Sequence, residues 1–90
     1  MATVILTHDV KDFASWKPVF DAGEGLRASA GVKVLGVYSD VDDANKVTVL
    51  ADFPSVEAIQ GFLSSPQLKS DMEAAGVTSA PELKILNKVG

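Results

Sequence analysis

Ninety residues suffice for one domain over residues 1–90 and leave no room for a second. The net charge of −4 argues against a nucleic-acid partner, because an acidic chain repels phosphates. The sequence has no cysteine, which excludes disulfides and thiolate chemistry. It shows neither a leader pattern nor an apolar run that could span a bilayer, so we expect a cytoplasmic protein without a membrane partner.

The first part of the chain predicts a strand followed by a long amphipathic helix. Residues 3–8 are β-branched and apolar, which is typical of a strand. Over residues 13–30 the apolar side chains fall on one arc at helical spacing, and Asp12 is a candidate N-cap. Gly23 weakens the middle of this helix, so we expect a kink there, and Gly31 is placed to end it.

The rest of the chain predicts a hairpin, two short helices and a last strand. These elements are expected over residues 32–39, 46–53, 56–63, 66–75 and 82–89. Ser55 and Ser65 are candidate N-caps of the two helices. Pro66 suits the first helical position of the second helix, and Gly76 suits its end.

The order strand, helix, hairpin, helix pair, strand is the ferredoxin-like βαββαβ pattern of the α+β class. It predicts a four-stranded antiparallel sheet with the helices on one face. Strict alternation places Val34 and Val37 on opposite faces of their strand. Some apolar side chains, including Ile5 and Leu50, are left for the helix-free face. We therefore expect a homodimer in which a second copy covers that face.

With these elements in place, nearly the whole chain resembles the dimeric α/β-barrel superfamily, in particular its antibiotic-biosynthesis-monooxygenase-like and stress-responsive members and small bacterial proteins of unassigned function. The resemblance rests on short segments, namely Thr7-His8-Asp9-Val10, Asp12-Phe13-Ala14-Ser15-Trp16, Arg27 ahead of Ala30-Gly31-Val32, Asp52-Phe53 and Ala75-Gly76-Val77. It implies a dimeric α/β barrel, and the relatives include cofactor-free oxygenases, isomerase-like proteins and members without known chemistry. Haem-degrading relatives use an axial histidine on a helix of the second half, and residues 56–75 contain none, which argues against haem.

Two side chains are candidates for catalytic proton transfer. His8, near the end of the first strand, is the only histidine and the only side chain whose ordinary pKa is close to neutrality. Asp52 follows three apolar residues, so its carboxylate could be partly buried and act as a base. The alternative for His8 is that its imidazole finds its hydrogen-bond partners locally, in the sheet or an interface. The alternative for Asp52 is that it caps the following turn or pairs with Arg27.

A ligand-binding role is predicted for one cation and several aromatic side chains. The helical position of Arg27 places it within the apolar arc, where its guanidinium needs an acceptor. That acceptor is either an anionic group of a ligand or a carboxylate, Glu24 or Asp52. Alternatively, the glycines shift the phase of the helix and Arg27 lies at the rim. The aromatic residues expected to wall a cavity between helices and sheet, or alternatively to fill the core, are Trp16, Phe20, Tyr38 and Phe62.

These residues leave three hypotheses open. The first is a cofactor-independent monooxygenase- or isomerase-like enzyme that acts on a small apolar or anionic molecule, with His8 or Asp52 as the base. The second is a binding module that uses the same cavity without chemistry, and the third is a structural or interaction protein with no cavity. We expect no cofactor, because the G-x-G-x-x-A run that starts at Gly23 has no strand before it, and no metal, because one histidine without cysteine is a poor ligand set.

Overall fold

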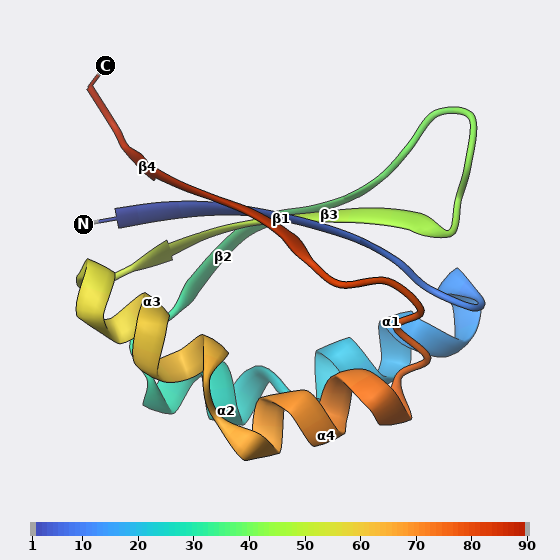
Figure 1. Cartoon of the computed structure of the whole chain (residues 1–90), viewed down its shortest axis with the longest axis horizontal. Coiled ribbons are helices and arrows are strands. Elements are labelled where there is room, and N and C mark those ends of the chain that lie inside the picture. Colours follow the sequence, from blue (N-terminus) through green and yellow to red (C-terminus); the bar gives the residue numbers. More distant parts are fainter. Residues whose placement is uncertain (1, 90) are drawn as a thin grey trace.

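The computed structural model describes residues 2–89 and contains a four-stranded antiparallel sheet with helices on one face (Figure 1). The strands are β1 (Ala2–Asp9), β2 (Lys33–Ser39), β3 (Lys46–Phe53) and β4 (Glu82–Asn87). Their order in the sheet is β2-β3-β1-β4, so the first strand is central and the last strand forms an edge. The predicted ferredoxin-like α+β fold is confirmed.

The helices are α1 (Phe13–Ala22), α2 (Glu24–Ser29), α3 (Val56–Leu63) and α4 (Pro66–Ala74). The long helix predicted over residues 13–30 is divided at Gly23, whose N–H donates to the carbonyl of Phe20 and closes α1. Gly31 and Gly76 have φ angles of 75° and 84°, as expected for glycines that end helices. Within residues 2–89, no helix is long and apolar enough to cross a membrane.

The helix starts follow the predicted caps only in part. Ser55 Oγ accepts a hydrogen bond from the N–H of Ala58 at 3.1 Å, as predicted for α3. Asp12 occupies the N-cap position of α1, but its carboxylate accepts from the Ser15 hydroxyl and does not cap the helix. Asn45 Oδ1 instead accepts the N–H of Phe13 at 2.9 Å. The loop between β2 and β3 is thereby tied to the start of α1.

The register assigns the strand residues to two faces. Residues directly opposite one another in an antiparallel pair share a face. Val4 is opposite Ala51 and His8 is opposite Val47, and these four side chains face the helices. Ile5 is opposite Leu50, on the helix-free face.

The predicted faces of β2 were wrong beyond its midpoint. Val34 is opposite Ala51, but the next pair joins Gly36 with Leu50, so Leu35 is an extra residue in a β-bulge. The bulge shifts the alternation by one position. Val37 therefore packs with the helices, on the same side as Val34, and not on the opposite face.

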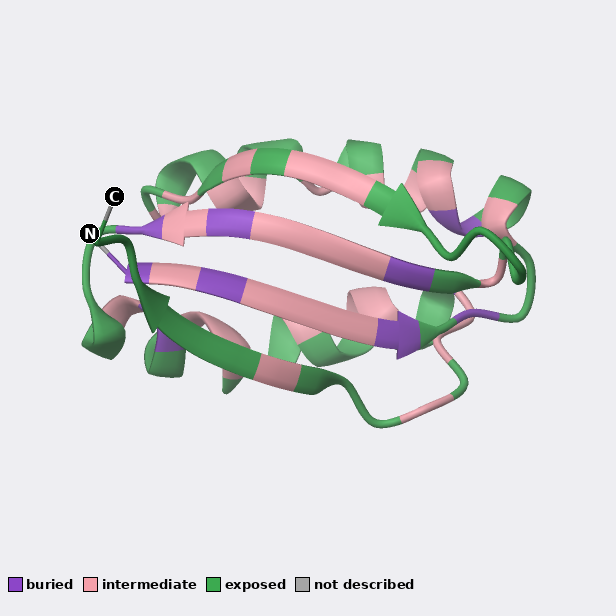
Figure 2. Cartoon of the chain, turned by 90° about the horizontal axis from the view of Figure 1, so that it is seen from above, coloured by how far each residue is buried: buried purple, intermediate pink, exposed green. Residues whose placement is uncertain are grey.

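The buried core consists of two clusters at opposite ends of the sheet. One contains Phe53 and Ile59, and the other contains Trp16 and Val47. Figure 2 shows the same division, since the buried segments of the two central strands lie toward their ends while their middle parts are less buried. The space between the clusters is where a cavity lies.

Candidate functional site

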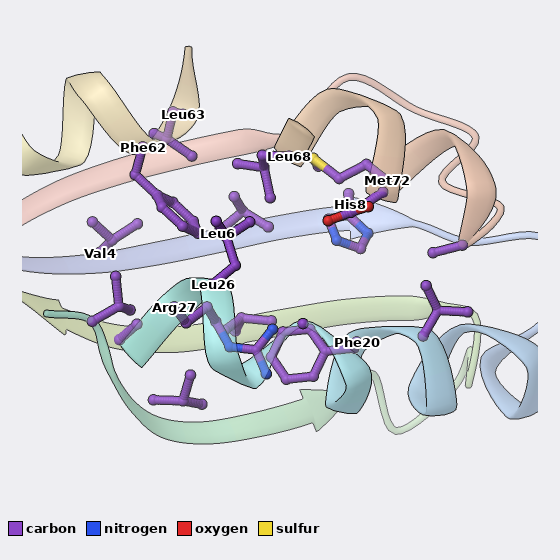
Figure 3. Close-up of a pocket in the computed structure, with 18 of the residues that line it drawn as sticks. Val4, Leu6, His8, Phe20, Leu26, Arg27, Phe62, Leu63, Leu68 and Met72 are labelled. Atoms are coloured by element: carbon purple, nitrogen blue, oxygen red, sulfur yellow. The ribbon is translucent and has the colours of Figure 1, made fainter. Parts of the chain in front are cut away.

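A half-enclosed cavity of about 240 Å³ lies between the helix-bearing face of the sheet and the four helices (Figure 3). Its walls are mostly apolar and come from every helix and from the three strands β1, β2 and β3, for example Val4, Leu6, Trp16, Phe20, Leu26, Val49, Phe53, Phe62, Leu68 and Met72. The ionisable side chains in these walls are His8, Arg27 and Asp71. Polar groups in an otherwise apolar pocket are expected to orient a ligand.

His8 projects from β1 into the wall of this cavity. Only 5% of the residue is exposed, and its Nδ1 atom is buried without a hydrogen-bond partner within residues 2–89. Burial lowers the pKa of His8 below its ordinary value of 6.5, while its own backbone and the Asp9 carboxylate raise it by smaller amounts. The neutral form of the imidazole is therefore favoured at physiological pH, and its Nδ1 atom makes no hydrogen bond within residues 2–89.

Aromatic side chains from α1 form a row beside His8. Phe13, Trp16 and Phe20 lie three and four residues apart, which brings them to one side of the helix. The Trp16 and Phe20 rings stack at 4.8 Å between centroids, and the His8 ring meets Trp16 edge-on at 5.7 Å. Trp16 is buried in the core and also lines the cavity, so the two roles considered for it coexist.

Arg27 extends from α2 over this aromatic row. Its guanidinium carbon lies 3.9 Å from the centre of the Phe20 ring, and Figure 3 shows the two side chains next to each other. Burial lowers the pKa of Arg27, while the carboxylates of Glu24 and Asp21 raise it. Within residues 2–89 its side chain makes no hydrogen bond or ion pair, so neither of the carboxylates considered from the sequence is its partner.

Phe62, in α3, lines the other end of the cavity. Its ring meets Phe53 edge-on, with centroids 5.6 Å apart. Figure 3 shows Phe62 and Leu63 descending from the helix toward the sheet. The aromatic walls predicted from Trp16, Phe20 and Phe62 thus lie around one cavity.

Two of the predicted site residues lie outside the cavity. Asp52 is on the helix-free face, where its carboxylate accepts a hydrogen bond from the Thr3 hydroxyl at 2.6 Å. Tyr38 is also on that face, and its ring lies against Gly36 and is 55% exposed. Neither side chain can contact a ligand in the cavity of its own chain, because the sheet lies between them and it.

Asp71, in contrast, lines the cavity and was not selected from the sequence. The sequence predicts the side of the helix on which Asp71 lies, because Leu68, Asp71, Met72 and Ala75 are spaced so that they share one side. The other three are apolar, and a carboxylate on an otherwise apolar side of a helix indicates a candidate functional position. The amide of Gln67 donates to Asp71 Oδ1 at 2.9 Å.

The arrangement suits proton transfer in an apolar space. A neutral imidazole in the cavity wall can take a proton from a bound molecule, and a guanidinium can hold negative charge. Within residues 2–89, no three side chains of the kind that bind metals gather in one place.

Comparison by sequence alone identifies no relatives: no family model matches this chain, and no curated protein does. The fold, however, recurs in solved structures of antibiotic biosynthesis monooxygenase-like proteins. A candidate enzyme of this kind from Bordetella bronchiseptica superimposes with a TM-score of 0.82, at 15% identity, over 98% of this chain and 96% of that one. A second, from Caulobacter crescentus, gives a TM-score of 0.77 at 21% identity, over 99% of this chain and 90% of that one.

A third similar structure is a variant of SnoaB, described as a cofactor-independent oxygenase from Streptomyces nogalater. It superimposes with a TM-score of 0.74 at 19% identity, over 97% of this chain and 91% of that one. At these identities the likeness is one of fold. The chain therefore has the fold of the antibiotic biosynthesis monooxygenase-like proteins, as the resemblance of its sequence segments predicts.

Proposed function

We propose that this protein is a cofactor-independent monooxygenase-like enzyme acting on a small, apolar, ring-bearing molecule bound between the sheet and the helices. The observation that carries the proposal is the state of His8, which is buried, neutral and unpartnered at Nδ1 in the wall of an apolar cavity. The likeness of the fold to an oxygenase that works without a cofactor supports it.

The chemistry requires only a base and a dry site. His8 removes a proton from a CH₂ group acidified by a neighbouring carbonyl, and the resulting enolate gives one electron to O₂. Recombination of the two radicals forms a C–O bond, and the peroxide anion takes back the proton held by His8. The hydroperoxide then loses water to leave a second carbonyl. A CH₂ group and O₂ thus become C=O and H₂O, so no external reductant is consumed. The apolar walls protect the charged intermediate from water.

The cavity limits the size of the ligand. Sites for drug-sized ligands occupy about 300–1,000 Å³, and this cavity, at about 240 Å³, is smaller. A molecule of two or three fused rings is therefore a better match than a longer one. Phe20 and Phe62 offer aromatic surface for such rings from opposite ends of the cavity.

Oxygen uptake tests the proposal. The probe is 2-tetralone, a two-ring ketone whose benzylic CH₂ lies next to its carbonyl, and the expected product is the 1,2-diketone. The wild-type protein should accelerate oxygen consumption over the buffer reaction, and the Asp52→Asn variant should match it, since Asp52 lies on the other face. Binding of the ketone without oxygen uptake would indicate instead a binding module, and no binding would contradict both functions.

We also propose that a second copy of the chain covers the helix-free face of the sheet. Large apolar side chains remain partly or largely exposed there, including Ile5, Leu50, Leu35 and Leu86. An exposed apolar face of this kind on a small domain is typical of an interface. Light scattering coupled to size-exclusion chromatography measures the oligomeric state directly.

A further inference from the structure

A second hollow adjoins the cavity and lies between α1, α2 and the edge strand β2. This groove has a volume of about 480 Å³, and its rim carries the charged side chains Lys17, Asp21, Glu24 and Lys33. Phe20 and Arg27 line both the cavity and the groove. The apolar cavity and the charged groove therefore meet at the Phe20–Arg27 pair.

Arg27 lies at this boundary, and within residues 2–89 its side chain forms no hydrogen bond or ion pair. Its guanidinium rests on the Phe20 ring, and Gly23 leaves room for it, because a β-carbon at position 23 would lie 3.1 Å from Nη1. Within residues 2–89 no carboxylate forms an ion pair with it. A positioned guanidinium with free donors is suited to a planar oxyanion, which it can bind through two parallel hydrogen bonds.

The charges around the groove favour an anion by a small margin. Asp21 is neutralised by Lys17, whose Nζ lies 2.6 Å from its carboxylate. The remaining charged groups of the groove are Glu24, Lys33 and Arg27, which together carry one net positive charge. The field of the groove therefore adds to the preference of Arg27 for a negative group.

We propose that the groove is a subsite for a carboxylate. The ligand is then an aromatic carboxylate whose rings lie in the cavity and whose anionic group reaches Arg27 at the boundary between the cavity and the groove. This inference rests on the proposed function, because it assumes that a ring system occupies the cavity. It adds the chemical class of the ligand and the residue that selects it. The edge of the Phe20 ring would contact the ligand's rings, because Trp16 stacks on this ring and the guanidinium lies over it.

Calorimetric titration with two matched probes tests the subsite. 2-Naphthoate carries the carboxylate at neutral pH, and 2-naphthamide has the same rings and a neutral group of similar shape. The wild-type protein should bind the naphthoate about tenfold more tightly than the amide, since charge-assisted hydrogen bonds are lost with the amide. Arg27→Gln should abolish that ratio and leave the affinity for the amide within about twofold.

Two further variants distinguish binding by a positioned guanidinium from non-specific attraction to positive charge. Arg27→Lys keeps the charge and loses the planar fork, so the ratio should fall to about threefold. Lys69→Gln removes one positive charge from an exposed position on α4, outside both hollows, and should leave the ratio unchanged. Equal binding of both probes to the wild-type protein would overturn the subsite alone. Failure of both probes to bind would overturn the proposed ligand cavity as well.

Discussion

The imidazole of His8 and the indole of Trp16 meet edge to face, with centroids 5.7 Å apart and planes inclined by 68°. One ring comes from the central strand β1 and the other from α1, so the contact joins the sheet to the helix layer. Aromatic contacts of this kind contribute about 0.5–1.5 kcal/mol beyond the area they bury. The indole thus packs against the His8 ring without forming a hydrogen bond with its Nδ1 atom.

The His8→Gln variant tests the role of His8 as the proposed base. It removes the only imidazole of the chain, and it retains a polar side chain of similar length. Because a positioned base contributes about 10²–10⁴-fold, oxygen uptake with 2-tetralone should fall at least about 100-fold. The affinity for 2-naphthamide should change little, since the apolar walls remain. A variant with unimpaired oxygen uptake would show that His8 is not the base.

The stability of the protein should depend on pH through His8. Its pKa in the folded state lies below the value of 6.5 that it has when unfolded, because burial disfavours the charged form. Its contribution to stability is therefore fully present above pH 6.5, declines as the pH falls toward the folded-state pKa, and changes no further below that value.

Urea unfolding from roughly pH 7.5 to 5 measures this effect, with His8→Gln as the reference for all other titrating groups. The free energy of unfolding of the wild-type protein should decrease more steeply toward acid than that of the variant. Parallel curves would mean that the pKa of His8 is the same in both states.

Two glycines in different environments should respond oppositely to alanine. Gly31 has a φ angle of 75°, and a β-carbon there would lie 2.8 Å from Cγ of Pro54. Gly31→Ala should therefore destabilise the protein by about 1–3 kcal/mol. Gly61 lies within α3 with open space around its Cα, so Gly61→Ala should stabilise the protein by about 0.5–1 kcal/mol. Thermal melting of the two variants, compared with the wild type, gives both signs.

A charged substitution tests whether the helix-free face is a dimer interface. Leu50 is paired with Ile5 in the two central strands, on the side away from the helices. Leu50→Lys should convert the proposed homodimer to a monomer, because a lysine at an apolar interface loses its hydration. Val41→Lys, at a 98% exposed position in the β2–β3 loop, is the matched control and should remain dimeric. A monomeric wild type in light scattering would contradict the proposed dimer.

Local patterns were sufficient for most of the fold but not for the faces of every strand. The alternation in β1 and β3 predicts their faces because neither strand contains an extra residue. The bulge at Leu35 depends on how β2 meets β3, a long-range relationship that the sequence of β2 does not reveal. Gly23, by contrast, acts on its own helix, and the predicted kink there appears as the break between α1 and α2.

The site was predictable to the extent that helical spacing determines it. Trp16, Phe20 and Arg27 were found because they share one arc, and the structure places all three at the cavity. Asp52 was chosen for the apolar residues before it, but a buried strand has two faces, and its side chain points to the one without helices. Asp71 was not among the predicted site residues, although it lines the cavity together with Leu68 and Met72.

The bulge in β2 also affects how readily a strand of another molecule can add to this edge of the sheet. β2 is an edge of the sheet, and an unbroken edge exposes N–H and C=O groups on which a foreign strand can add. The extra residue Leu35 interrupts the regular spacing of those groups, and the Tyr38 ring folds back against Gly36 beside it. Growth of fibril-like ribbons from this edge is therefore disfavoured, although the neighbouring sheet surface stays apolar.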